Sequence, residues 1–366
     1  MPSFFDNARR ALSFCFSGSL MQRLNALQNI FVDAVFQKKS LGSFPVMPAL
    51  ELTNHCNLSC EMCSRHWAPL KEGEISETLL KKIEKEILPR ISEISLTGYG
   101  EPMLSKSFRR TIESAKRHKV KVFFFTNATL LDEKMSEFLV KQKVDEITVS
   151  LDGATKKTFE KIRRNARFGN VIENIKRFSK IKSEKRAVLP RLRAEFVAMR
   201  QNINELQQMP ALAQSLGAEE LKVTHLAVFD KRFEKQSLVS FPALLHAQFE
   251  ATKKTAKAAG IKLDLPIDFS SGFDAAVPAC LLPWVHAYIR FDGKVQVCCW
   301  FEDAVMGDLN AQSFSEIWNN EKYKKFRELV NSSAPLKPCL GCENRFRYLK
   351  NKNFKQTYLK MRPRKK

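Results

Sequence analysis

The segment Thr53-Asn-His-Cys-Asn-Leu-Ser-Cys-Glu-Met-Cys63 holds three cysteines, Cys56, Cys60 and Cys63, with the spacing C-x3-C-x2-C. One short loop thus offers three thiolates, an arrangement that cluster-binding loops use. Three protein ligands leave one iron of a four-iron cluster open, and an open iron can bind a substrate or a cofactor. The segment therefore predicts a reactive iron–sulfur site rather than a closed structural one.

A zinc site is the alternative interpretation of this cysteine loop (residues 53–63). Zinc sites usually close with a fourth ligand and favour C-x2-C pairs. His55 and His66 could each supply that ligand. The loop alone leaves both interpretations open, so the rest of the chain has to decide between them.

The chain of 366 residues has room for one large domain with a smaller appendage, or for two to three domains. Its hydrophobic fraction of 44% predicts a sizeable core.

The sequence contains no run of about 18 apolar residues, so we expect no membrane-spanning helix. Arg9 and Arg10 precede a short apolar stretch, but no convincing cleavage site of a secretory signal follows it. The nine cysteines include the spacings C-x3-C-x2-C and C-x2-C, which suit metal binding in a reducing cytosol better than a disulfide scaffold, so we expect a cytoplasmic protein.

The charge is strongly and unevenly basic, with 61 basic and 39 acidic residues and a net charge of +22. Basic residues concentrate between Lys161 and Arg193 and in the tail from Lys350 to Lys366, which has no acidic residue. Such stretches can attract nucleic acid, an anionic membrane surface or an acidic partner. A solvated basic surface with a disordered tail explains them equally well, and no recognised nucleic-acid-binding module is present.

Helical and strand-like patterns alternate along most of the chain. Residues 20–37 read as an amphipathic helix with Leu20, Leu24, Leu27, Ile30, Phe31 and Val35 on one side. The candidate strands after it are Ala49–Thr53, Glu93–Thr97, Val120–Thr126, Glu146–Asp152, Leu192–Met199 and Glu220–Thr224. The candidate helices between them are Glu77–Leu88, Phe108–His118, Glu133–Lys141, Asn170–Lys182 and Asn204–Leu216, with Asp132 as the N-cap of the third. This alternation predicts a parallel sheet with right-handed crossovers.

Polar or glycine-rich residues follow four successive strands of that sheet. They are Thr53-Asn54, Thr97-Gly-Tyr-Gly-Glu-Pro102, Thr126-Asn127 and Ser150-Leu-Asp-Gly153. An open sheet and a barrel both fit the pattern, and both bind ligands at the carboxyl ends of their strands. One such strand end would indicate an ordinary turn, but four at the same rim predict a site.

The cysteine loop resembles the signature of the radical S-adenosylmethionine (radical SAM) enzymes. In that family the open iron binds the amino and carboxylate groups of SAM, and a residue at the place of Met62 lies near the adenine. Gly100-Glu101-Pro102 resembles the family's glycine–glutamate motif, which receives the SAM amino group, although Tyr99 replaces a glycine that is common there. The resemblance covers residues 48–225 and implies a partial (β/α)6 barrel of TIM type.

Other strand ends resemble the family in the same order. Thr126-Asn127 is similar to the threonine–asparagine after its third strand, and Ser150 and Asp152 are similar to residues near the SAM ribose and carboxylate. Arg163 resembles the arginine that pairs with that carboxylate, a planar partner well suited to a guanidinium. Arg163 could equally be one more member of a basic helix. The adenine motif of the fifth strand is matched only in approximate location, by Phe196–Met199 and Asn202.

Four further cysteines lie near the C-terminus, namely Cys280, Cys298, Cys339 and Cys342. Arg290–Val297 between the first two predicts two strands joined by a tight turn at Asp292-Gly293. Four sulfurs from two such regions can hold a structural zinc or a cluster.

The spacing C-x12-G-x4-C around Gly293 resembles the SPASM extension of radical SAM enzymes, as do Met306–Leu309 and Phe314–Trp318. The full SPASM pattern continues with more cysteines, whereas here Tyr348 stands at the next position. The resemblance therefore implies one auxiliary [4Fe–4S] cluster on Cys280, Cys298, Cys339 and Cys342. Side chains alternate along a strand, so Cys298 and Cys299 are expected to point to opposite faces. The spacing from Gly293 favours Cys298 as the cluster ligand. Cys15 has no partner spacing and is expected to be an apolar filler.

These features predict an N-terminal helical extension (1–47), a radical SAM barrel (48–265), a small SPASM-like iron–sulfur domain (266–349) and a basic tail (350–366). The resemblance implies an oxidoreductase or maturase that splits SAM reductively and uses the 5′-deoxyadenosyl radical to abstract hydrogen from a substrate. The expected cofactors are a radical SAM [4Fe–4S] cluster, one auxiliary [4Fe–4S] cluster and SAM, with flavodoxin or ferredoxin as reductant.

The substrate is not readable from the residues. A peptide, a small molecule to be dehydrogenated and a cofactor precursor all remain open, and a peptide or an anionic small molecule would suit the charge. We expect specificity to lie in Ala227–Ser271. The alternative function is a non-enzymatic zinc or nucleic-acid-binding protein with a basic surface.

Overall fold

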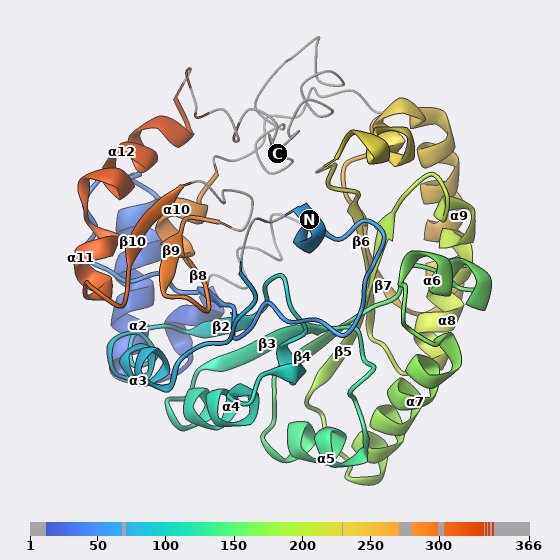
Figure 1. The fold of residues 1–366 in the computed structure, drawn as a ribbon, viewed down its shortest axis with the longest axis horizontal. Coiled ribbons are helices and arrows are strands. Elements are labelled where there is room, and N and C mark those ends of the chain that lie inside the picture. The colour runs from blue at the N-terminus through green and yellow to red at the C-terminus, as the bar shows by residue number, and fades with distance from the viewer. Residues whose placement is uncertain are drawn as a thin grey trace.

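The computed structural model describes residues 12–67, 71–228, 230–270, 280–298, 304–332, 334, 336 and 339. One ten-stranded sheet lies at its centre, with the strand order β10-β9-β8-β1-β2-β3-β4-β5-β6-β7. Figure 1 shows this sheet curving like part of a barrel wall, with the helices on its outside. The prediction of an α/β fold with a partial barrel is therefore confirmed.

The first seven strands run parallel, each paired with the next along the chain. They are β1 (Ala49–Leu50), β2 (Glu93–Leu96), β3 (Lys121–Thr126), β4 (Glu146–Ser150), β5 (Arg191–Ala198), β6 (Glu220–His225) and β7 (Lys262–Asp264). The six predicted strands are all present. The short strand β7 adds a parallel edge that the sequence pattern did not indicate.

Helices connect these strands and cover the outer face of the sheet. They are α3 (Glu77–Glu86), α4 (Phe108–Arg117), α5 (Glu133–Lys141), α6 (Lys156–Ile162), α7 (Phe168–Glu184), α8 (Met209–Ser215) and α9 (Pro242–Ala259). Short 3-10 turns add η2 (Ser64–Trp67), η3 (Pro102–Leu104), η4 (Ile203–Gln208), η5 (Lys231–Gln236) and η6 (Leu238–Ser240). Asp132 caps α5 as predicted, because its carboxylate accepts a hydrogen bond from the Met135 backbone N–H.

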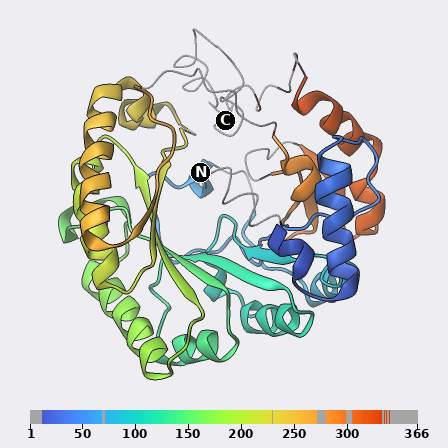
Figure 2. The ribbon, with the colours of Figure 1, turned by 180° about the vertical axis from the view of Figure 1, so that it is seen from behind.

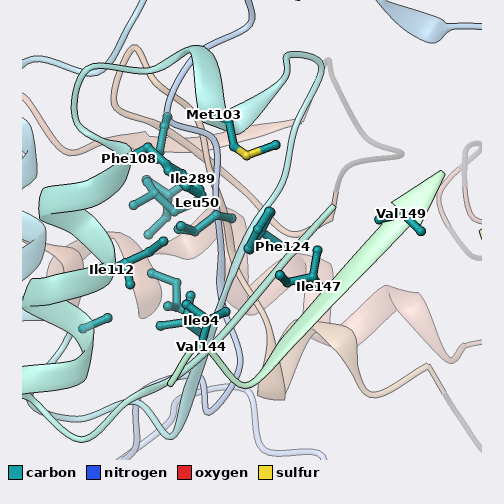
Figure 3. Packing of buried hydrophobic residues seen from close by; sticks show 14 of the residues in the cluster. Leu50, Ile94, Met103, Phe108, Ile112, Phe124, Val144, Ile147, Val149 and Ile289 are labelled. Carbon is teal, nitrogen blue, oxygen red and sulfur yellow. The ribbon is translucent and has the colours of Figure 1, made fainter. Parts of the chain in front are cut away.

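The main core lies between the sheet and these helices. On α4, Phe108, Ile112 and Ala115 recur at helical spacing and are almost wholly buried. The Phe108 ring meets the Phe124 ring of β3 edge to face, with centroids 5.2 Å apart. Figure 3 shows this packing, with Ile94 and Ile147 beside it. The alternation along each strand sends its other side chains to the opposite face, which is the inside of the partial barrel.

The N-terminal helix is present but differs in detail from the prediction. It runs as α2 (Leu20–Leu27) and continues as a π-helical segment η1 (Gln28–Ala34). Its predicted apolar side faces outward, with Leu20 72% and Leu24 57% exposed. Polar side chains such as Asn29 are buried instead.

The C-terminal part extends the same sheet at its other edge. Its elements are α10 (Leu282–Val285), β8 (Tyr288–Ile289), β9 (Lys294–Gln296), β10 (Val305–Asp308), α11 (Phe314–Trp318) and α12 (Glu321–Val330). The predicted turn at Asp292-Gly293 joins β8 to the antiparallel β9, and Gly293 takes the left-handed φ of +86°. Strand β8 pairs in parallel with β1 through Ala49–Tyr288 and Leu50–Ile289. Among the described residues, no helix is long and apolar enough to cross a membrane.

Candidate active site

The cysteine loop is held from two sides. The Glu101 backbone N–H donates to the His55 carbonyl over 2.9 Å, which attaches the loop to the segment after β2. On the other side, the N–H groups of Ser59 and Glu61 donate to the carbonyls of Arg164 (3.1 Å) and Ile162 (2.8 Å). The loop therefore lies across the carboxyl ends of the strands, between the segment after β2 and the end of α6, in a conformation fixed by the protein.

The thiols of this loop lie in a largely buried, nitrogen-rich setting. The Asn127 side-chain amide and the Arg163 guanidinium each donate to a sulfur over 3.9 Å, the former to Cys56 and the latter to Cys60. Burial raises the pKa of the Cys56 thiol, and it raises the pKa of Cys60 to about 11 although Arg163 opposes the shift. A coordinated iron would take up the thiolate charge, so the donor set fits a cluster.

The zinc interpretation finds no support in the imidazoles of this region. The His55 ring lies 3.3 Å from the Glu72 carboxylate, and the His66 ring nitrogen contacts the Cys60 carbonyl at 3.1 Å. Within the part of the chain that the structure describes, no three thiol, imidazole or carboxylate groups are placed to hold a single metal ion. A four-iron cluster is wider than one ion and needs its ligands farther apart.

Glu101 lies buried beneath the cysteine loop, where its carboxylate accepts three hydrogen bonds. Thr126 Oγ1 donates to Oε1 over 2.9 Å, the Asn127 backbone N–H donates to Oε2 over 2.8 Å, and the Met103 N–H adds a longer contact of 3.4 Å. Burial raises the pKa of Glu101 to about 7 against these hydrogen bonds. The structure thus brings the predicted residues Glu101, Thr126 and Asn127 into one network.

Gly100 is required by the close approach of two backbone segments. A Cβ atom at this position would collide with the backbone carbonyl oxygens of Thr53 and His55. The glycine therefore allows the segment after β2 to press against the cysteine loop. This contact places Glu101 and Cys56 on the same rim.

Asp152 and Arg163 form a buried ion pair at the end of β4. Their Oδ2 and Nη2 atoms are 2.7 Å apart, and Asp152 Oδ1 also accepts from the Val197 backbone N–H over 2.9 Å. Asn202 donates to the Asp152 carbonyl over 3.0 Å, so β4 and β5 are tied together here. Ser150, at the end of β4, is half-buried. The ion pair links the cysteine loop to the inside of the barrel, because Arg163 also contacts Cys60.

Met62 joins two apolar clusters. It packs against the main core and against a second cluster formed by Ile162, Met199, Leu226, Val228 and Val239. An apolar surface therefore lies next to the sulfur ligands. Such a surface is suited to contact the flat face of a nucleobase.

Two groups of charged residues were missed by the sequence reasoning. Glu51, one residue beyond β1, accepts from the Tyr99 backbone N–H over 2.7 Å and fills the space beside Gly98. Burial raises its pKa to about 8, with Tyr288 and Arg290 opposing the shift. A glutamate inside an apolar strand pattern was the available signal.

The second group lies inside the barrel, on β5 and β6. Glu195 and Lys222 alternate with wholly buried neighbours and so point to the inner face. Burial raises the pKa of Glu195, while Lys222 opposes the shift and Arg163 interacts from the rim. The inside of the barrel is therefore polar and charged, which suits a polar substrate.

Three of the four predicted auxiliary ligands are described. Cys339 is buried, while Cys280 and Cys298 are half-buried and pack against the main core. Asn331, the C-cap residue of α12, accepts a hydrogen bond from the Cys280 backbone N–H over 3.0 Å and so holds that segment. Cys342 and the competing Cys299 lie outside the described residues, as does the basic tail. The choice of Cys298 over Cys299 stays a prediction.

Comparison with known families matches this arrangement. The model of the radical SAM superfamily matches residues 50–190, and the model of the SPASM iron–sulfur cluster-binding domain matches residues 280–343. The fold and site therefore define a SAM-dependent iron–sulfur enzyme. The chain belongs to the radical SAM superfamily and carries a SPASM domain, so its cofactors are [4Fe–4S] clusters and SAM.

Curated relatives align over most of their length. The tungsten-containing aldehyde ferredoxin oxidoreductase cofactor-modifying protein of Pyrococcus furiosus is 26% identical, covering 81% of this chain and 86% of its own. The AdoMet-dependent heme synthase of Methanosarcina barkeri is 24% identical, with 84% and 93% covered. The PqqA peptide cyclase of Gluconobacter oxydans is 25% identical, with 84% and 85% covered.

Solved structures share the fold. SuiB of Streptococcus suis bound to S-adenosylmethionine superposes with a TM-score of 0.66 at 18% identity, covering 89% of this chain and 79% of that chain. The anSMEcpe structure with bound AdoMet and Cp18Cys peptide has a TM-score of 0.62 at 17% identity, with 79% and 84% covered. Both likenesses concern the architecture of the barrel and its C-terminal extension.

Proposed function

We propose that this protein is a radical SAM maturase that cleaves SAM reductively and abstracts hydrogen from a peptide substrate. The observation that carries the proposal is the convergence of the cysteine loop, the Glu101 network and the Asp152–Arg163 pair at one rim of the barrel. When bound there, the cluster and SAM would supply a 5′-deoxyadenosyl radical. Cys56, Cys60 and Cys63 would hold the cluster and leave one iron for SAM.

The residues around the loop would bind and orient SAM. The Glu101 carboxylate would accept hydrogen bonds from its amino group, and the Arg163 guanidinium would pair with its carboxylate. Ser150 and Asp152 would lie near the ribose, and the apolar surface around Met62 would lie near the adenine. The buried walls of the rim exclude water from the reacting atoms.

A peptide is the substrate class that the charged inner face favours. Glu195 and Lys222 are cross-strand neighbours that interact with each other. Peptide groups and ionised side chains can pair with both residues, whereas a wholly apolar substrate would offer them no polar partner. Several relatives are named peptide cyclases or mycofactocin maturases, and SuiB has been solved with its precursor peptide. A small anionic molecule is the competing substrate class.

Accessory components follow from the same chemistry. A low-potential donor such as flavodoxin or ferredoxin would reduce the cluster. Cys280, Cys298, Cys339 and Cys342 would hold one auxiliary cluster, either as an electron acceptor or as a structural element. Free thiols as ligands suit a reducing compartment such as the cytoplasm.

The test is anaerobic formation of 5′-deoxyadenosine from SAM with dithionite. Cys60→Ala should abolish it, while Cys15→Ala, a matched change at a buried cysteine outside the site, should leave it intact. The iron content should be about eight per chain if two four-iron clusters are present. Full activity of Cys60→Ala, or zinc without iron after reconstitution, would overturn the proposal. Peptides that increase 5′-deoxyadenosine and themselves change in mass would identify the substrate class.

A further inference from the structure

The exposed hydrophobic side chains of this protein are concentrated at one place. The described residues expose twelve large hydrophobic side chains, and nine of them lie between residues 12 and 36. These nine, which we call the apolar stripe, are Leu12, Phe16, Leu20, Met21, Leu24, Leu27, Phe31, Val35 and Phe36. Scattered single hydrophobic residues are ordinary on a surface, whereas Leu20, Leu24, Leu27, Phe31 and Val35 recur at helical spacing along α2 and η1 and so share one face.

The outward direction of the stripe is fixed by polar anchors on the other side of the helix. Gln22 is wholly buried and donates to the carbonyls of Leu88 (3.2 Å) and His118 (2.8 Å). Asn29 is also wholly buried and donates to the Trp284 carbonyl over 2.7 Å. Turning the stripe toward the core would break these bonds and bury unpaired polar groups. The helix is therefore built to present its apolar face to its surroundings.

The segment that carries the stripe exposes only basic charges of its own. Asp33 is the only acidic residue among residues 12–40, and it is wholly buried, where it accepts hydrogen bonds from Gly42 and Ser43. Arg23, Lys38 and Lys39 on the same segment are exposed, although Lys38 lies 3.8 Å from Asp33 and Lys39 pairs with Glu328 at 2.7 Å. The exposed Arg117 and Lys119 flank His118, which Gln22 contacts. Cations thus lie on the segment that carries the stripe and beside the residue that anchors its α2 helix.

We propose that the apolar stripe docks this protein on the surface of an anionic lipid bilayer. An amphipathic helix with cations beside its apolar face lies in the plane of the bilayer, with its hydrophobic side chains at the boundary of headgroups and acyl chains. The exposed cations complement the negative surface potential of acidic lipids. Gln22 of α2 contacts carbonyls that shortly precede β2 and β3, so the helix lies at the amino ends of these strands, opposite the rim that carries the cysteine loop. In Figure 2, which views the molecule from behind, α2 is drawn in blue.

The experiment measures binding of the intact, cluster-loaded protein to vesicles by co-sedimentation. Vesicles of phosphatidylcholine with phosphatidylglycerol in a ratio of about 7:3 should bind it more tightly than phosphatidylcholine alone, because the cations add an electrostatic attraction. Raising the salt concentration should weaken the preference for anionic vesicles and leave the hydrophobic contribution to binding unchanged. The double variant Leu24→Gln with Phe31→Gln should lower the affinity about tenfold or more.

A matched pair of substitutions separates the stripe from general surface effects. Val35 belongs to the stripe and is 62% exposed, whereas Val188 lies far along the chain and is 82% exposed. The two variants Val35→Gln and Val188→Gln make the same change at these two positions. Only Val35→Gln should weaken vesicle binding, and both should keep wild-type formation of 5′-deoxyadenosine, which is independent of docking. Equal loss in both variants, or no preference for anionic vesicles, would overturn the proposal. It would also fail if light scattering showed a dimer that the stripe variants dissociate, because the stripe would then join two copies.

Discussion

At the scale of single residues, the site depends on a few residues that each form hydrogen bonds or ion pairs with two different segments of the chain. The Asn127 side chain donates to Cys56 and to Asn57 while its backbone N–H donates to Glu101. Arg163 contacts both Cys60 and Asp152. Sequence motifs identified these residues because their types and order resemble the family pattern. The contacts among them, and the place of Glu51 beside them, became visible only in the folded chain. The spacing of residues along the sequence does not indicate which residues of other strands they contact.

Glu101→Ala should weaken SAM binding without loss of the cluster. A charge-assisted hydrogen bond contributes roughly 1.5–3 kcal/mol, so we expect the affinity for SAM to fall about tenfold or more. Equilibrium binding of SAM to the reconstituted protein, beside its visible absorption spectrum, provides the measurement. Glu133→Ala on the exposed first turn of α5 is the control and should bind SAM normally. Unchanged affinity in Glu101→Ala would remove this residue from the SAM site.

At the scale of elements, regular patterns were predictable and irregular ones were not. Helix α5 was predicted with both its bounds, because Asp132 caps it and its apolar residues recur at helical spacing. Helix α9 was missed, although Pro242 at its start and Gly260 in the left-handed region at its end are typical of helix boundaries. Strands β1, β7 and β8 are only two or three residues long and exist because neighbouring strands pair with them. Which face of the N-terminal helix is buried depends on hydrogen-bond acceptors such as the Trp284 carbonyl, which lie far away in the sequence.

Asn29→Ala should destabilise the protein through this helix. The substitution leaves the Trp284 carbonyl without its side-chain donor, whereas the Phe44 carbonyl keeps the hydrogen bond from the Asn25 amide. A buried unpaired group costs about 1–3 kcal/mol. Urea unfolding followed by circular dichroism would measure the loss. Asn170→Ala at an exposed position of α7 is the control and should change the free energy of unfolding by less than about 0.5 kcal/mol. Equal stability of the two variants would show that the helix is attached by other contacts.

At the scale of the whole molecule, one buried carboxyl group connects the two parts of the chain. Glu51 follows β1 of the barrel and interacts with Tyr288, Arg290 and Phe291 around β8. Its pKa is raised from an ordinary value of 4.5 to about 8 by burial. The folded protein therefore holds this proton more tightly than the unfolded chain, and the ionised form is disfavoured at the junction.

This raised pKa predicts a pH dependence of stability. The contribution of Glu51 is fully present below about pH 4.5 and is lost as the pH rises through about 8. The slope from this one group is about 1.4 kcal/mol per pH unit at most. Glu51→Gln should therefore flatten the decline of the unfolding free energy between pH 5.5 and about 8, whereas Glu133→Gln should not. Parallel pH profiles of Glu51→Gln and the wild-type protein would refute the role of this carboxyl group.

The pairing of β1 with β8 also bears on how the gene can be divided. The two family models match separate stretches of the chain, yet one continuous sheet runs through both. A fragment ending after β7 would leave the edge of β1 without the backbone partners that β8 provides. Unpaired edges recruit other strands, so such a fragment would tend to aggregate. The radical SAM and SPASM portions are therefore expected to be inherited, expressed and folded together as one unit.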